Sequence, residues 1–173
     1  MKKSELKQLI KECINEAKQL SDLYHFTDIL SLLKIAEEET LGIYGSVSLT
    51  RNKNFPKIDR AIPKECFIVL DGEKLSENYK IKPYQFPGYE DQSEEMVNRP
   101  IKNLNRYIKS VCIYENNLDS FIGDHIDDYQ DRKDIENLIT EKNSMDEMIP
   151  QDILDFLNFR FNVKVEVIWK NQN

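Results

Sequence analysis

The sequence predicts an α+β domain built on a mixed or antiparallel sheet. Several short apolar segments recur along the chain with few helical patterns between them, which favours α+β over a doubly wound α/β fold. The continuous apolar run Cys66–Leu70 suits the centre of a sheet. A length of 173 residues fits one domain with a core of its own. We therefore expect residues 1–173 to form a single domain.

The helices are predicted from apolar residues at three- and four-residue spacing. Thr27 or Asp28 is the expected N-cap of the second helix, and Pro150 suits the first turn of the last one. The helical segments are Lys3–Leu20, a helix after Asp28 that buries Ile29 to Ile35, a helical turn at Leu75–Tyr79, Leu118–Ile126, Arg132–Glu141 and Gln151–Phe159.

The strands are predicted from β-branched and aromatic runs, several of them alternating between apolar and polar residues. They are Leu23–Thr27, Val47–Thr50, Cys66–Leu70, Tyr79–Tyr84, Glu95–Val97, Tyr107–Tyr114 and Phe161–Trp169. Polar stretches with proline predict loops at Asn52–Pro63 and Gln85–Gln92. The domain thus divides into an N-terminal amphipathic helix (1–20), a core (21–114) and an acidic helical segment with a C-terminal strand (115–173).

The composition is that of an ordinary globular protein, with 40% hydrophobic and 32% charged residues. No apolar run is long enough to span a bilayer, and the N-terminus mixes charges without the apolar region of a secretory signal. The three cysteines are scattered and form no CxxC pair, which indicates reduced thiols. We expect a cytoplasmic protein that does not bind a membrane.

The net charge of −7 disfavours a protein that follows a phosphate backbone, because such proteins carry a basic face. One segment is locally basic, and a nucleic acid would have to bind through this basic patch. Its residues are Arg99, Lys102, Arg106 and Lys109.

Several common kinds of site have no signature in the sequence. There is no Gly-rich phosphate loop and no His-Glu-x-x-His pair, and the chain has only two histidines, His25 and His125. Four aspartates lie close together without the glycine and glutamate of an EF-hand, so a solvated helix face is preferred over a weak calcium site. These are Asp124, Asp127, Asp128 and Asp131. We expect no metal.

Three polar segments next to predicted strands are the candidates for chemistry. They are Leu23–Thr27 with His25, Ser46–Arg51 with Ser48 and Thr50, and Ser93–Val97 with two glutamates. Each has a plain structural alternative: a histidine satisfied within the fold, the outer side chains of an edge strand, and a charged surface pair. Their occurrence in this order favours one shared cleft.

The run Leu-Tyr-His-Phe-Thr at 23–27, followed by a helix ending in Leu-Leu-Lys-Ile-Ala-Glu-Glu, resembles the opening of ADP-ribosyltransferases. It is similar in particular to the DNA-targeting toxins called DarT. The segment Glu95–Lys109 resembles the strand that carries their catalytic glutamate, and Ser46–Arg51 occupies the place of their second strand. The likeness covers residues 23–114 and implies a split mixed or antiparallel sheet with flanking helices. The opening Met-Lys-Lys-Ser-Glu-Leu-Lys and Val69–Leu75 also resemble uncharacterised proteins of tailed phages, which implies a host cytoplasm as the location.

The resemblance implies an enzyme that uses NAD as a substrate and transfers ADP-ribose to a macromolecular acceptor. Glu95 would be the catalytic residue, because a carboxylate beside the ribose stabilises an oxocarbenium-like transition state. Glu94 remains the alternative, since adjacent residues of a strand point to opposite faces.

The expected NAD-binding residues come from the same three segments. His25 would bond a ribose hydroxyl, Thr27 or the strand backbone would hold the nicotinamide amide, and Arg51 would pair with the diphosphate. An aromatic ring would stack on the nicotinamide. The binding set is His25, Thr27, Ser48, Thr50, Arg51 and Phe55, with Tyr44 and Tyr24 as alternative stacking residues, Tyr24 being disfavoured because it alternates with His25.

Two further functions stay open. The middle strand lacks the tyrosine of the diphtheria-toxin branch, and the tail is acidic, so the chain could be an inert member of the fold that binds or inhibits a host protein. Alternatively, the apolar stripe from Leu6 to Leu20 could dock the protein onto a virion or a second copy.

Overall fold

The computed structural model describes residues 3–19, 21–42, 45–53, 65–83, 94–126, 133, 135–137, 139 and 149–168. The described strands are β1 (Leu23–Thr27), β2 (Thr40–Leu41), β3 (Val47–Thr50), β4 (Cys66–Leu70), β5 (Ile81–Pro83), β6 (Glu94–Val97), β7 (Ile101–Lys102), β8 (Ile108–Tyr114) and β9 (Val165–Ile168). The described helices are α1 (Lys3–Gln19), α2 (Ile29–Glu38), α3 (Gly72–Asn78), the 3₁₀ turn η3 (Leu104–Arg106), α4 (Glu115–Ile126) and α6 (Pro150–Phe161).

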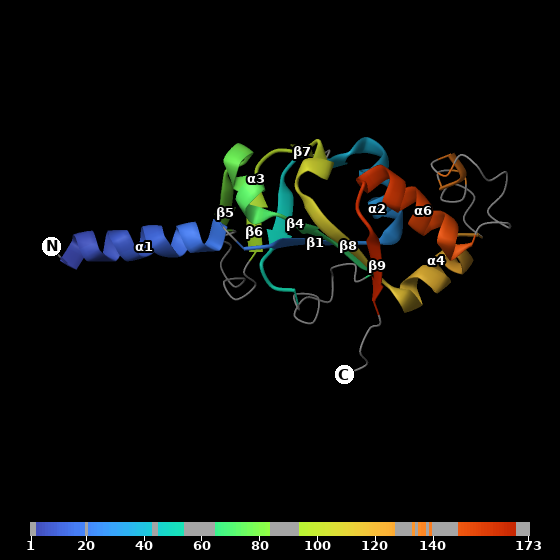
Figure 1. Cartoon of the computed structure of the whole chain (residues 1–173), viewed down its shortest axis with the longest axis horizontal. Coiled ribbons are helices and arrows are strands. Elements are labelled where there is room, and N and C mark those ends of the chain that lie inside the picture. The colour runs from blue at the N-terminus through green and yellow to red at the C-terminus, as the bar shows by residue number, and fades with distance from the viewer. Residues whose placement is uncertain are drawn as a thin grey trace.

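Seven strands form one mixed sheet in the order β5-β6-β3-β1-β4-β8-β9, and β2 and β7 form a separate pair (Figure 1). Every pairing in the large sheet is antiparallel except β8 with β9, which is parallel. A parallel pair needs a long connection, and the chain between these two strands contains α4 and α6. The prediction of an α+β protein with a mixed sheet is confirmed.

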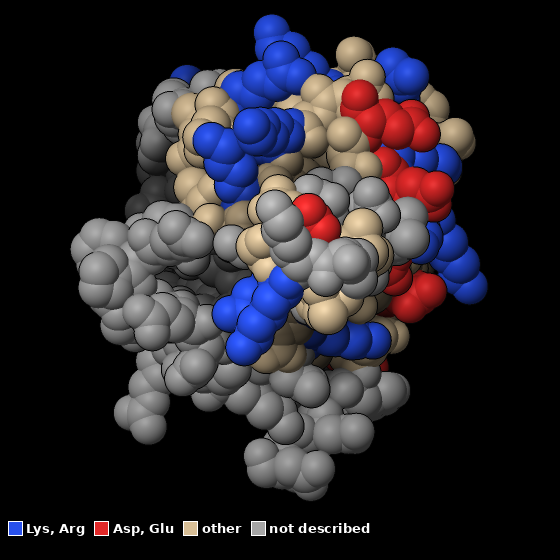
Figure 2. All heavy atoms as spheres, turned by 90° about the vertical axis from the view of Figure 1, so that its left-hand side faces the viewer, with Lys and Arg blue, Asp and Glu red and all other residues tan. Residues whose placement is uncertain are grey.

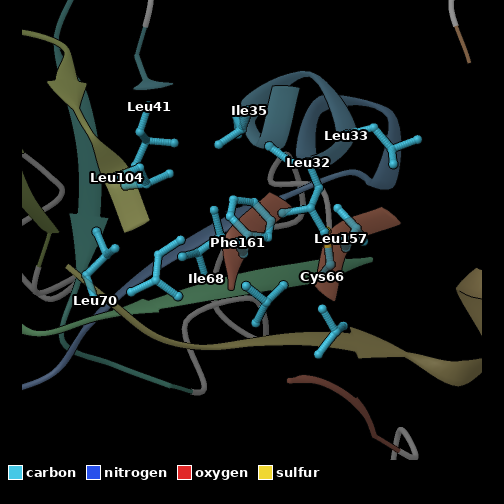
Figure 3. Packing of buried hydrophobic residues seen from close by; sticks show 14 of the residues in the cluster. Leu32, Leu33, Ile35, Leu41, Cys66, Ile68, Leu70, Leu104, Leu157 and Phe161 are labelled. Carbon is cyan, nitrogen blue, oxygen red and sulfur yellow. The ribbon is translucent and has the colours of Figure 1, made fainter. Parts of the chain in front are cut away.

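The helix-covered face of the sheet, which carries Leu23, Ile68 and Leu70, packs into the main core. Figure 3 shows Leu32 of α2 and Phe161 of α6 pointing at this layer. Each of these five side chains is completely buried. Removal of this apolar surface from water supplies most of the free energy that holds the helices on the sheet.

The opposite face, here called the aromatic face, has its own smaller cluster. Phe67 lies at its centre, with ring centroids 5.3 Å from Phe26, 6.0 Å from Tyr24 and 6.0 Å from Tyr114. The rings meet at tilted or edge-on angles, which their quadrupoles favour. The continuous apolar run in β4 is thus explained, because its residues are buried on both faces.

The start of α2 is fixed by two carboxylates. The Asp28 side chain accepts a hydrogen bond from the Ser31 amide at 2.6 Å, as the predicted N-cap should. Glu65, just before β4, accepts from the Ile29 amide at 2.9 Å. The helix that follows β1 is thereby tied to the next strand of the sheet.

Helix α1 stands apart from this body. It projects from the end of the molecule that carries β5, β6 and α3 (Figure 1). Its Leu6, Leu9 and Ile10 are 43%, 52% and 49% exposed. The sequence predicts that this apolar stripe packs on something, and in the described part of the chain these three side chains face solvent. Among the described helices, none combines the length and the apolar character that crossing a bilayer needs.

Candidate functional site

The three polar segments singled out in the sequence lie on three neighbouring strands. β3 lies between β1 and β6, although β4 and β5 come between β3 and β6 in the chain. The three strands lie next to one another in the same sheet, as the hypothesis of a shared cleft requires.

The strand register places His25 and Glu95 on one face. His25 is opposite Ile68 of β4, so it belongs to the helix-covered face. Tyr24 pairs with Thr50, which puts His25 beside Leu49, and Leu49 in turn pairs with Glu95. His25, Leu49 and Glu95 therefore form a row across three strands, with the two polar residues two strand spacings, about 10 Å, apart.

The same register separates the two glutamates. Glu95 pairs with Leu49, and Glu94 pairs with Thr50 of the aromatic face. Alternation therefore gives Glu95 the register position on the face of His25 and gives Glu94 the other one. The register of β6 against β3 thus distinguishes two residues that the sequence leaves as alternatives.

Glu95 is engaged by Arg51 rather than open to solvent. The Arg51 Nε donates to Glu95 Oε1 at 2.9 Å, and the two side chains are 13% and 7% exposed. A second guanidinium nitrogen, Nη1, donates to the hydroxyl of Ser21. Instead of reaching out to a diphosphate, the role that the resemblance implies, Arg51 links the candidate catalytic carboxylate to the segment that joins α1 to β1.

His25 is held in one tautomer by the neighbouring strand. Its Nδ1 lies 3.0 Å from the carbonyl oxygen of Ser48, so Nδ1 carries the proton and Nε2 is the acceptor. Burial lowers the pKa of His25 from its usual 6.5 and outweighs the opposing influence of the Ser48 carbonyl and Asp28. A neutral imidazole with its lone pair on Nε2 can accept a hydrogen bond from a hydroxyl group, the role expected for it.

We expect this pKa to be measurable by NMR titration, because the chain has only two histidines. The midpoint of His25 should lie below 6.5, and a His125→Gln variant assigns the two signals. Since the native state binds the proton more weakly than the unfolded chain, the contribution of His25 to stability is present above pH 6.5 and is lost as the pH falls through the lower native pKa. A midpoint at or above 6.5 would contradict the neutral state of this imidazole.

Thr27 shares the face of His25 but is buried. It pairs with Cys66 in β4, and the residue is 6% exposed. Its carbonyl accepts a weak bond from the Cys66 thiol at 3.2 Å. Thr27 is therefore buried at the end of β1 that pairs with Cys66, and its side chain is not exposed to solvent.

The other expected binding residues are not brought to this row. Ser48 and Thr50 belong to the aromatic face, and the Thr50 hydroxyl accepts from the Asn52 amide at 3.0 Å. Tyr24 also lies there against Phe67, as strand alternation predicts. The remaining two stacking candidates, Tyr44 and Phe55, lie outside the described residues.

The structure also reveals anchors that the sequence does not indicate. Asp22, next to Ser21, forms an ion pair with Lys109 of β8 at 2.6 Å. The two described residues between α1 and β1, Ser21 and Asp22, thus contact charged side chains, Arg51 just after β3 and Lys109 in β8. A single Ser-Asp pair ending a helix carries no sequence signal for such contacts, because its partners lie 30 and 87 residues away.

The basic patch consists of exposed side chains. The Arg99 guanidinium lies 4.6 Å from the centroid of the Tyr79 ring, and Lys109 is the partner of Asp22. Figure 2 shows Lys and Arg side chains in several separate groups on the end of the molecule from which α1 projects, with most of the Asp and Glu side chains toward the right. Within the described residues, no group of three His, Cys, Asp or Glu side chains is arranged to hold a metal ion.

Comparison of the chain with protein-family models, with curated proteins and with solved structures finds no match. The geometry of the β1–β3–β6 row is therefore the basis on which a function can be assigned.

Proposed function

We propose that the protein is an NAD-dependent ADP-ribosyltransferase-like enzyme with Glu95 as its catalytic carboxylate and His25 as a ribose-binding residue. The observation that carries the proposal is the row of His25, Leu49 and Glu95 on one face of three adjacent strands. His25 would supply a hydrogen-bond acceptor and Glu95 a carboxylate to a sugar, while Leu49 between them is 1% exposed and belongs to the main core.

In the proposed reaction the bond between nicotinamide and the ribose C1′ breaks, and nicotinamide leaves with the electron pair. C1′ then carries positive charge, which the Glu95 carboxylate stabilises from nearby. The acceptor's nucleophilic atom forms the new bond to C1′ and releases its proton to water. His25 Nε2 accepts a hydrogen bond from a ribose hydroxyl and so orients the sugar.

Arg51 is the residue that positions Glu95 in this proposal. Its Nε holds one carboxylate oxygen, Oε1, at 2.9 Å, which fixes the orientation of the carboxylate. The second oxygen, Oε2, is then the one that faces the developing charge. The expected contact of Arg51 with the diphosphate is not part of the proposal, because its guanidinium already donates hydrogen bonds to Glu95 and Ser21.

The test measures release of free nicotinamide from NAD by the purified protein, so that no acceptor has to be known. Glu95→Gln should lower the rate by about 10²–10³-fold, the usual effect of removing one stabilising group from a charged transition state. Glutamine keeps an oxygen that can accept from the Arg51 Nε, and a urea denaturation curve of the variant checks that it is still folded. The matched control is Glu94→Gln, which alters the alternate position of the same strand and should keep the rate.

Equal rates for wild type and Glu95→Gln, or a loss in Glu94→Gln alone, would overturn this assignment. Labelled NAD incubated with a cell lysate then tests transfer to a macromolecular acceptor. The acceptor, a phage origin and a cytoplasmic location stay predictions of the sequence.

A second candidate function follows from the buried Arg51–Glu95 pair. A carboxylate that is 7% exposed and already paired is also what an inert member of the fold would keep for stability. In that case the protein would act by binding a host protein. Absence of nicotinamide release from wild type, together with a stoichiometric partner that Glu95→Gln retains in a pull-down, would establish this candidate over the enzyme.

A further inference from the structure

Ser21 lies where the buried Arg51–Glu95 pair reaches the surface. Its hydroxyl accepts a hydrogen bond from Arg51 Nη1, while Arg51 Nε donates to Glu95 Oε1 at 2.9 Å. The Arg51 and Glu95 side chains are 13% and 7% exposed, whereas Ser21 is an exposed residue. The three residues form a continuous chain of contacts from the segment before β1 to the candidate catalytic carboxylate.

The two contacts of Arg51 depend on each other, because both nitrogens belong to one planar guanidinium. Rotation about the Cδ–Nε bond moves Nη1 and swings the Nε–H group at the same time, since the donors of the group have a fixed geometry. A partner at Nη1 therefore restricts the direction in which Nε–H points. Ser21 is such a partner, and Glu95 lies in the direction that remains.

Ser21 is held in place by the residues that follow it. Asp22 forms an ion pair with Lys109 of β8 at 2.6 Å. Leu23, the first residue of β1, is completely buried in the main core. The position of the Ser21 hydroxyl relative to Arg51 is therefore set by the sheet.

We infer that Ser21 is a positioning residue for Glu95 and acts through Arg51. By holding Nη1 it keeps Nε on Oε1 of the carboxylate, which leaves Oε2 for the ribose. The inference rests on the proposed function, because positioning matters to a reaction only if Glu95 is the catalytic carboxylate. Ser21 touches neither the substrate nor the reacting atoms in this arrangement, so its loss should lower turnover and leave substrate binding unchanged.

The first test follows the Arg51 Nε–H proton by NMR and needs no substrate. Exchange of this proton with water requires its bond to Glu95 to open, so the rate reports on that bond. In Ser21→Ala the exchange should be about 2- to 10-fold faster, the change in an opening equilibrium that one lost hydrogen bond produces. Ser21→Thr keeps a hydroxyl and should restore slow exchange. Arg51→Lys, which lacks the Nε–H group, assigns the signal.

Ser120→Ala is the matched control for this measurement. Ser120 is also an exposed serine, and its hydroxyl donates to the carbonyl oxygen of Asn116 within α4 at 3.0 Å. The same substitution there removes a hydrogen bond of a different element. Exchange of the Arg51 Nε–H proton should keep its wild-type rate in this variant.

The second test measures nicotinamide release over a range of NAD concentrations. Ser21→Ala should lower kcat by up to about 10-fold, the limit set by one hydrogen bond. KM should stay at the wild-type value, because the lost contact is not one with the substrate. Ser21→Thr should recover kcat, and urea denaturation checks that Ser21→Ala is folded under the assay conditions.

The two tests can fail separately. Wild-type exchange of Arg51 Nε–H in Ser21→Ala, or equal acceleration in Ser120→Ala, would overturn the inference even if wild type releases nicotinamide. A higher KM with an unchanged kcat in Ser21→Ala would place Ser21 in substrate binding and would also overturn it. Faster exchange in Ser21→Ala without nicotinamide release from wild type would refute the proposed function and leave Ser21 as a structural partner of Arg51.

Discussion

Arg51→Met is expected to lower the free energy of unfolding by about 3–5 kcal/mol. The substitution leaves the Glu95 carboxylate, 7% exposed, without its partner at 2.9 Å. A carboxylate in such a place is then desolvated without a partner, which costs free energy. Urea denaturation of wild type and variant measures the change.

The control for this prediction removes both charges. In the double variant Arg51→Met with Glu95→Leu, no buried charge is left unpaired, and ion pairs replaced by apolar residues of similar size are often neutral or stabilising. The double variant should therefore unfold at higher urea than Arg51→Met alone. If both variants are equally destabilised, the lower free energy of unfolding comes from other contacts of Arg51, including its bond to Ser21, and not from the unpaired Glu95 carboxylate.

The second large effect is expected in helix α6. Phe161 is completely buried in the main core beside α2 (Figure 3), and Phe161→Ala should lower the free energy of unfolding by about 3–5 kcal/mol. The cost combines the lost transfer of the ring out of water with the cavity that remains. Thermal or urea unfolding measures it.

Phe159 provides a matched control two residues earlier in the same helix. It is 81% exposed, so Phe159→Ala should change the free energy of unfolding by no more than about 0.5 kcal/mol. The pair tests whether α6 packs on the same core as the strands near the N-terminus, as the prediction of one domain over residues 1–173 requires. Equal, small effects of the two substitutions would show that α6 is not part of that core.

Local sequence patterns predict most described elements closely. The strands Leu23–Thr27, Val47–Thr50 and Cys66–Leu70 match their predicted bounds, and the first helix is described from Lys3 to Gln19, with its predicted last residue, Leu20, outside the described residues. In each of these elements, the apolar spacing that predicts it depends only on residues close together in the chain. By contrast, the predicted strand from Phe161 begins four residues later, because α6 continues to Phe161 before the chain turns at Asn162.

Other differences have similarly local causes. The short β2–β7 pair has no counterpart among the predicted strands, because strands of two residues carry no detectable alternation. The helix after Asp71 starts before the predicted turn at Leu75, since the Asp71 side chain caps it at Lys74. Most of the predicted helix Arg132–Glu141 and the two predicted loops lie outside the described residues.

Strand alternation can be predicted from the sequence, and it is enough to put His25 and Tyr24 on opposite faces of one strand. It does not reveal which strands are neighbours. β3 and β6 are separated by more than forty residues at their paired positions Leu49 and Glu95, and such pairings are decided by the whole core rather than by local preference.

The folded sheet is therefore what puts Glu95, and not Glu94, on the face of His25. The fold also pairs Arg51 with that glutamate and assigns Ser48 and Thr50 to the other face. The physical reason is the two-residue period of a strand: a shift of one residue in register would have exchanged every one of these assignments. For α1 the division is reversed, because its apolar spacing can be read from the sequence, and the structure adds that Leu6, Leu9 and Ile10 are exposed.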